Sequence, residues 1–99
     1  MKIYIAGKIT GDDEYYEKFQ RAAMKVRAAG HVVITPTILP NGLEWEDYMH
    51  ICYSLIDVAE AVFMLKDWTE SRGATEEHRY AHHTGKIVLY EGECLAVLP

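Results

Sequence analysis

Two adjacent carboxylates, Glu76 and Glu77, follow a polar turn that runs from Lys66 to Arg72. A partly desolvated carboxylate can act as a nucleophile or as a general base. Successive residues of a helix diverge by about 100°, so two neighbouring side chains cannot both face one cleft. If Ala74 and Ala81 pack inward, Glu77 lies on their side of the helix and Glu76 is rotated away. The spacing therefore favours Glu77 as the reactive group, although acidic residues also stabilise helix N-termini without any further role.

The segment Ser71-Arg72-Gly73 precedes the same expected helix and could bind an anion. A hydroxyl group, a guanidinium group and free helix N–H groups together can hold a phosphate. A capping serine beside a solvated arginine explains the same three residues without a ligand. Both interpretations are compatible with the local sequence.

A second candidate for ligand binding is the short loop Gly7-Lys8-Ile9-Thr10-Gly11. Glycines at such a loop allow backbone N–H groups to approach a ligand closely. The loop matches neither a P-loop nor a dinucleotide-binding fingerprint, and a plain turn would account for it as well.

The composition argues against several classes of partner. The net charge of −5 argues against a nucleic acid polymer as the ligand, because phosphate backbones require a basic face. His78 and His82 have the i, i+4 spacing of a metal pair, but no His-Glu-x-x-His motif accompanies them, so we expect no metal. No cofactor is indicated either.

Two cysteines, Cys52 and Cys94, do not form a disulfide framework, and no apolar run approaches the length of a membrane span. The first residues contain too short an apolar run for a signal peptide. We therefore expect a cytoplasmic protein that does not contact a membrane, and the 99 residues suffice for a single domain, 1–99.

Apolar strands alternate with amphipathic helices along the chain. The helical stripes comprise Tyr15, Phe19, Ala22, Ala23 and Val26, and then Trp45, Met49, Cys52, Ile56 and Ala59. Asp12 and Asp13 are candidates for the N-cap of the first helix. We expect strands at 3–6, 31–35, 61–65 and 87–90 and helices at about 14–29, 43–58 and 73–84. Residues 94–98 could form a fifth strand or an apolar tail that packs on a neighbouring chain.

This order predicts an α/β fold, a flavodoxin-like (Rossmann-like) three-layer sandwich with a parallel sheet of four or five strands. The simplest right-handed topology has the strand order 2-1-3-4, followed by 5 if the last strand forms. Its switch point lies between the first and third strands. The loops 7–11 and 66–72 should therefore face each other across one cleft.

The segment Ile3-Tyr-Ile-Ala-Gly-Lys-Ile-Thr-Gly11 and the pattern Trp68-x-x-Ser71-x-Gly-Ala-x-x-Glu77-x-x-Tyr-Ala81, with Gly85-Lys86, resemble the nucleoside 2-deoxyribosyltransferase-like superfamily. The nearest resemblance is to its small branch of unknown function, the DUF4406 family. It covers nearly the whole chain and implies the same flavodoxin-like fold.

The resemblance also implies roles for individual residues. In active members a glutamate that matches Glu77 attacks C1′ of the sugar, and a tyrosine that matches Tyr4 hydrogen-bonds this nucleophile. Ser71 matches a phosphate-binding serine of nucleoside 5′-monophosphate glycohydrolases. The Gly7–Gly11 loop matches the segment that wraps the sugar and phosphate, and Lys8 replaces a residue that is more often proline.

One position departs from the superfamily pattern. Active members usually carry an aspartate on the second helix that helps to protonate the leaving base or to orient the nucleophile. The corresponding position here is Cys52. Neither Asp57 nor Asp47 substitutes for it in an obvious way.

The sequence thus leads to two hypotheses. The first is an N-glycosidase or deoxyribosyltransferase-like protein that acts on a nucleoside 5′-monophosphate through Glu77 and Tyr4. Ser71, Gly73, Ala74 and the Gly7–Gly11 loop would hold the ligand, and Trp68 would either stack on the base or belong to the core. The alternative is a catalytically weak module that binds or senses a nucleotide in the same cleft, as Cys52 suggests. By the resemblance, the protein is expected to form a homo-oligomer.

Overall fold

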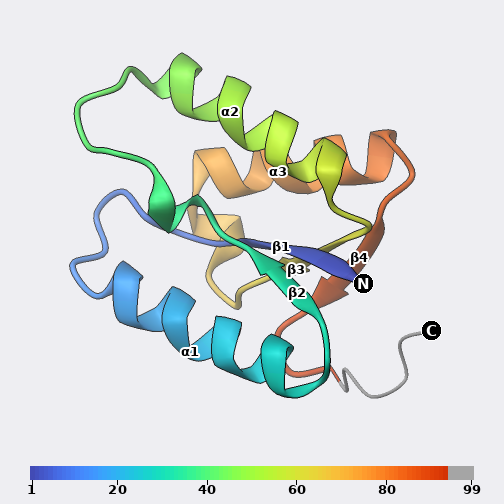
Figure 1. Cartoon of the computed structure of the whole chain (residues 1–99). Coiled ribbons are helices and arrows are strands. Elements are labelled where there is room, and N and C mark those ends of the chain that lie inside the picture. Colours follow the sequence, from blue (N-terminus) through green and yellow to red (C-terminus); the bar gives the residue numbers. More distant parts are fainter. Residues whose placement is uncertain (94–99) are drawn as a thin grey trace.

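Four parallel strands form the central sheet of the computed structural model, which describes residues 1–93 (Figure 1). They are β1 (Lys2–Ala6), β2 (Val32–Ile34), β3 (Ala61–Met64) and β4 (Ile87–Tyr90), in the order β2-β1-β3-β4. The two central strands are almost wholly buried, as expected for a parallel sheet that is covered on both faces. The order predicted from the sequence is therefore confirmed for four strands, and the proposed fifth strand lies outside the described residues.

The helices form a layer on each side of the sheet. Helix α1 (Tyr15–Ala28) covers one face, whereas α2 (Trp45–Val58) and α3 (Arg72–His83) cover the other (Figure 1). Two short 3-10 segments, η1 (Pro36–Ile38) and η2 (Trp68–Glu70), lie in connections that the sequence predicted as irregular. The structure is thus the expected flavodoxin-like three-layer α/β sandwich.

Helix α1 follows its predicted apolar stripe, because Phe19, Ala22, Ala23 and Val26 are all buried against the sheet. The helix ends before Gly30, which has a φ of +92° and donates its N–H to the carbonyl of Arg27. The predicted N-cap was wrong: Glu14 occupies that position without a side-chain cap. The Asp12 carboxylate instead accepts a hydrogen bond from the Glu14 N–H at 2.9 Å, because the chain turns tightly before the helix begins.

Each face of the sheet has its own core cluster. Alternating residues of β1 point to opposite faces, so Ile3 and Ile5 pack toward α1 while Tyr4 and Ala6 pack toward α2 and α3. Among the described residues, none of the helices combines the length and apolar character needed to cross a membrane.

Candidate functional site

A cavity of about 340 Å³ lies at the carboxyl ends of the central strands. One wall is formed by the loop after β1, and the opposite wall by the first turns of α3. The topology predicted this arrangement, because both segments leave the sheet at its switch point. The lining residues are Gly7, Ile9, Thr10, Tyr15, Pro36, Thr37, Leu39, Pro40, Asn41, Trp45, Tyr48, Met49, Ser71, Gly73, Ala74 and Glu77.

Glu77 is the acidic residue of this lining. It is 6% exposed and lies on the inward face of α3 with Ala74 and Ala81, as the helical spacing indicated. Glu76 is rotated away from the cavity and pairs with Arg79 instead. The burial of a carboxylate at this point is costly unless polar groups contact it.

Two polar groups face the Glu77 carboxyl group from other elements. The Tyr4 hydroxyl of β1 donates a hydrogen bond to Oε2 of Glu77, and the Cys52 thiol of α2 lies beside the same carboxyl group. Burial raises the pKa of Glu77 to about 7, and the contacts with Tyr4 and Cys52 act in the opposite direction. Glu77 therefore exchanges its proton near neutral pH, which suits a base or a nucleophile.

Tyr4 and Cys52 keep their protons at that pH. Burial is the largest cause that raises the pKa of Tyr4 well above its ordinary value, and the charge of Glu77 adds to it. Burial also raises the pKa of the Cys52 thiol to about 12, again with a contribution from Glu77. Tyr4 consequently donates its proton in a hydrogen bond to Glu77, and Cys52 stays a neutral thiol beside the same carboxyl group.

The two walls of the cavity are joined by a lysine that sequence reasoning missed. Lys18 Nζ donates to the carbonyl of Lys8 at 2.8 Å and to Asp12 Oδ2 at 2.6 Å, and it also pairs with Asp67. The other oxygen of Asp67 accepts the backbone N–H of Lys8 at 3.0 Å. Because Asp67 follows β3 and Lys8 follows β1, this network fixes the loop that carries Gly7, Ile9 and Thr10 against the segment that leads into α3.

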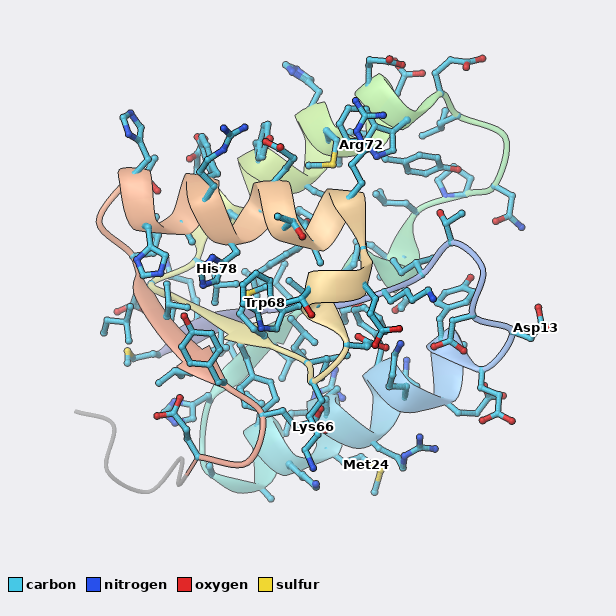
Figure 2. All side chains as sticks on the ribbon, turned by 180° about the vertical axis from the view of Figure 1, so that it is seen from behind. Asp13, Met24, Lys66, Trp68, Arg72 and His78 are labelled. Carbon is cyan, nitrogen blue, oxygen red and sulfur yellow. The ribbon has the colours of Figure 1, made fainter. Side chains whose placement is uncertain are left out.

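At the N-terminus of α3, Ser71 has both of the positions that its sequence allowed, that of a helix cap and that of a residue in the cavity wall. The Ser71 hydroxyl caps the helix by accepting the Ala74 N–H at 3.1 Å, and it also lines the cavity. Arg72 extends toward α2, where its Cζ lies 3.8 Å from the centroid of the Trp45 ring (Figure 2). The Arg72 side chain is therefore exposed on one side and packed on an aromatic ring on the other.

The structure brings most of the predicted binding residues together. Gly7, Ile9, Thr10, Ser71, Gly73, Ala74 and Glu77 line the cavity, with Tyr4 bonded to Glu77. Gly7 is required sterically, because an added Cβ would lie 2.7 Å from Cδ1 of Leu65.

Three predicted residues lie outside the cavity lining. Lys8 directs its Nζ toward Glu70, 3.9 Å away, and Gly11 is an exposed turn residue with a φ of +82°. The Trp68 ring stacks on His78 with centroids 4.0 Å apart, on the side of α3 that faces β4 (Figure 2). Trp68 is therefore a packing residue of that face and does not reach the cavity.

A third wall was not anticipated from the sequence. It consists of the connection after β2 and the start of α2, with Pro36, Thr37, Leu39, Pro40, Asn41, Trp45, Tyr48 and Met49 in the lining. The Tyr48 hydroxyl holds this connection by donating to the carbonyl of Pro40 at 2.6 Å. The rule that ligands bind at the carboxyl ends of parallel strands could have identified it, since β2 ends at the same edge.

Within residues 1–93, no group of three or more His, Cys, Asp or Glu side chains is arranged to hold a metal ion.

Comparison with known proteins defines the class of this fold. The structure superposes with a TM-score of 0.70 on a 2-desoxiribosyltransferase from Leishmania mexicana, at 20% sequence identity. The match covers 90% of this chain and 62% of that chain, so this chain spans less than two thirds of its structural relative. The fold is nucleoside deoxyribosyltransferase-like.

The family follows from the sequence match. Residues 1–90 match the model of a domain of unknown function, DUF4406, and the chain belongs to that family. No curated protein matches the chain.

Proposed function

We propose that the protein cleaves or transfers the N-glycosidic bond of a nucleoside 5′-monophosphate, with Glu77 as the nucleophile. The observation that supports this most strongly is the buried Glu77 carboxylate, which lines a cavity and accepts a hydrogen bond from Tyr4. The volume of about 340 Å³ falls in the range of small-molecule sites.

The reaction would proceed by double displacement. An oxygen of the Glu77 carboxylate forms a bond to C1′ while the bond from C1′ to the base nitrogen breaks, and the base leaves with that electron pair. Water, or a second base, then attacks C1′ and returns the carboxylate. Tyr4 would orient Glu77 by holding Oε2 and leaving the other oxygen free for attack.

The 5′-phosphate would lie at the N-terminus of α3. The Ser71 oxygen accepts the Ala74 N–H, which leaves its own O–H free to donate to a phosphate oxygen. The first N–H groups of the helix, including that of Gly73, have no partner within the helix and favour an anion. Gly7, Ile9 and Thr10 would contact the sugar and phosphate from the opposite wall.

A nucleotide-binding or sensing module is the second candidate function. Cys52 favours it, because a neutral thiol stands beside Glu77 where active members of the superfamily are expected to carry an aspartate. A site without that acid could bind a nucleotide in the same cavity and turn it over slowly or not at all.

One experiment separates the two functions. The protein is incubated with a panel of ribonucleoside and deoxyribonucleoside 5′-monophosphates, free base is measured by chromatography, and binding is measured in parallel by calorimetry. Glu77→Gln and Glu77→Ala are tested alongside, with Glu76→Gln as the matched control, because Glu76 is half-buried and pairs with Arg79 outside the cavity lining.

An enzyme would release base in the native protein and in Glu76→Gln, and both Glu77 variants would lose at least about 10³-fold in rate, as is typical when a nucleophile is removed. Base release that persists in both Glu77 variants would exclude the mechanism. Saturable binding without turnover would identify a binding module.

A further inference from the structure

The cavity lining has a one-sided distribution of charge. Of the lining residues described in 1–93, Glu77 is the single one of acidic or basic type, and no Lys, Arg or His side chain is among them. A positively charged ligand would therefore meet the Glu77 carboxylate and no lysine, arginine or histidine of the described lining.

Aromatic rings complete this environment. Tyr15, Trp45 and Tyr48 line the same cavity, and aromatic faces attract cations. The Trp45 ring already does so, since the Arg72 guanidinium lies against it at 3.8 Å. A planar cationic ring would thus find both a negative charge and aromatic surfaces in the described lining.

The described lining holds no carboxylic acid other than the nucleophile Glu77 that could protonate a departing base. A neutral nucleobase leaves as an anion unless an acid supplies a proton during bond cleavage. The Cys52 thiol, with its pKa raised to about 12, and the Tyr4 hydroxyl, with its pKa raised well above 10, both retain their protons too strongly.

We propose that the substrates of this site are nucleoside 5′-monophosphates whose base carries a positive charge, such as an N7-alkylated purine or a pyridinium ring. This inference rests on the proposed N-glycosidic cleavage and specifies its substrate class. The aromatic and anionic lining selects the cation, and the cation makes a general acid unnecessary.

The chemistry balances without an acid. As a Glu77 oxygen bonds to C1′, the electron pair of the C1′–N bond passes to the base nitrogen and neutralises the ring, which leaves as a neutral molecule. Water then attacks C1′, the bond between C1′ and Glu77 breaks, the carboxylate regains its electron pair, and one proton passes to solvent. The positive ring also favours the ionised form of Glu77 on binding, because a nearby opposite charge stabilises a carboxylate.

The test compares 7-methylguanosine 5′-monophosphate and nicotinamide mononucleotide with guanosine 5′-monophosphate, and Glu77→Gln supplies the background rate for each. We expect kcat/KM for the cationic nucleotides to exceed that for guanosine 5′-monophosphate by at least about 10³-fold, within the range that general acid catalysis contributes.

Cationic N-glycosides are also intrinsically more reactive, so a variant must isolate the effect of the missing acid. Cys52→Asp introduces an acid beside Glu77 and should reduce the preference by at least about tenfold, by accelerating the neutral substrate. Cys52→Ser is the matched control, because it changes the thiol without supplying an acid, and it should keep the preference of the native protein.

Binding provides a second measurement that does not depend on whether Cys52→Asp folds. In the Glu77→Gln background, Trp45→Leu should weaken binding of nicotinamide mononucleotide by about tenfold, as expected for a desolvated cation–π contact. Trp68→Leu, which alters the tryptophan stacked on His78 outside the cavity lining, should leave the dissociation constant unchanged.

The outcomes of the two proposals differ. Cationic and neutral nucleotides that are cleaved within tenfold of each other, both in a Glu77-dependent way, would overturn the substrate class and leave the glycosidase proposal intact. A preference that persists unchanged in a folded Cys52→Asp protein would also overturn it. Absence of base release from every nucleotide would overturn both proposals.

Discussion

On the α1 side of the sheet the core cluster consists of apolar side chains, whereas on the α2 and α3 side the core includes Tyr4 and Cys52 in contact with the buried Glu77. A single strand contributes to both, since Ile3 and Ile5 of β1 point to one side and Tyr4 to the other. The α1 face shows that this sheet can be covered without buried polar groups. The polar groups of the opposite face lower the stability that apolar packing alone would provide, and under the proposed function the reaction at Glu77 requires them.

The largest expected effect on stability lies on the apolar face. Phe19 is fully buried between α1 and the sheet, so Phe19→Ala should lower the free energy of unfolding by about 3–5 kcal/mol. Urea denaturation with tryptophan fluorescence measures this change. Base release by the molecules that remain folded should be unaffected, and a selective loss of activity at full folding would contradict the separation of the two faces.

The polar face should respond to pH, because burial raises the pKa of Glu77 from 4.5 to about 7. The folded protein holds this proton more tightly than the unfolded chain, so the group favours folding below pH 4.5 and loses that contribution as the pH rises through about 7. By linkage, the contribution of Glu77 to the free energy of unfolding is about 3 kcal/mol larger below pH 4.5 than above pH 7.

Glu77→Gln removes this titration. The stability of Glu77→Gln relative to the native protein should therefore increase between pH 4.5 and pH 7 and then level off. Parallel denaturation curves at several pH values measure the difference, and a constant offset across that range would show that Glu77 is not a buried titrating group.

Tyr4→Phe tests whether the hydrogen bond from Tyr4 sets both the orientation and the ionisation of Glu77. Loss of the hydroxyl removes a donor that stabilises the carboxylate, so the pKa of Glu77 should rise further. Base release should fall about 10–100-fold at neutral pH, which corresponds to the free energy of one hydrogen bond to a charged group. The pH dependence of kcat/KM measures both effects. A lower rate without a shift of the profile to higher pH would assign Tyr4 a packing role.

The smallest expected effect concerns Lys18, which joins the two walls of the cavity. Lys18→Met should raise KM for a nucleoside monophosphate by about tenfold, roughly 1.4 kcal/mol, with a smaller change in kcat, because the loop that carries Gly7, Ile9 and Thr10 loses its attachment. Lys18→Arg should restore much of the affinity. Lys25→Met, at an exposed lysine of the same helix, is the control, and equal effects of the two methionine variants would refute a positioning role for Lys18.

Much of the fold could be predicted because its determinants are local or follow from handedness. The stripe through Phe19, Ala23 and Val26 specified α1, and right-handed crossovers reduced the possible strand orders until β2-β1-β3-β4 was the simplest. The same topology predicted that the Gly7 loop and the start of α3 share a cavity. The homo-oligomer and the cytoplasmic location stay predictions.

The candidate site was less predictable, because side-chain direction depends on tertiary packing. Helical spacing was enough to choose Glu77 over Glu76. Nothing local to Trp68 and Trp45 indicates that the first packs on His78 and the second lines the cavity. Lys18 was missed because its partners, Lys8 and Asp67, are distant in the sequence from each other and meet only when β1 and β3 pair.

The most direct test of the central claim is to trap the covalent intermediate on Glu77. A 2′-fluoro nucleoside 5′-monophosphate slows steps that pass through an oxocarbenium-like transition state and should allow the glycosyl-enzyme to accumulate. Intact mass spectrometry followed by peptide mapping should show one added fluorinated sugar phosphate on Glu77, and none in Glu77→Gln. Release of base without an adduct, or an adduct on another residue, would contradict the assignment of Glu77 as the nucleophile.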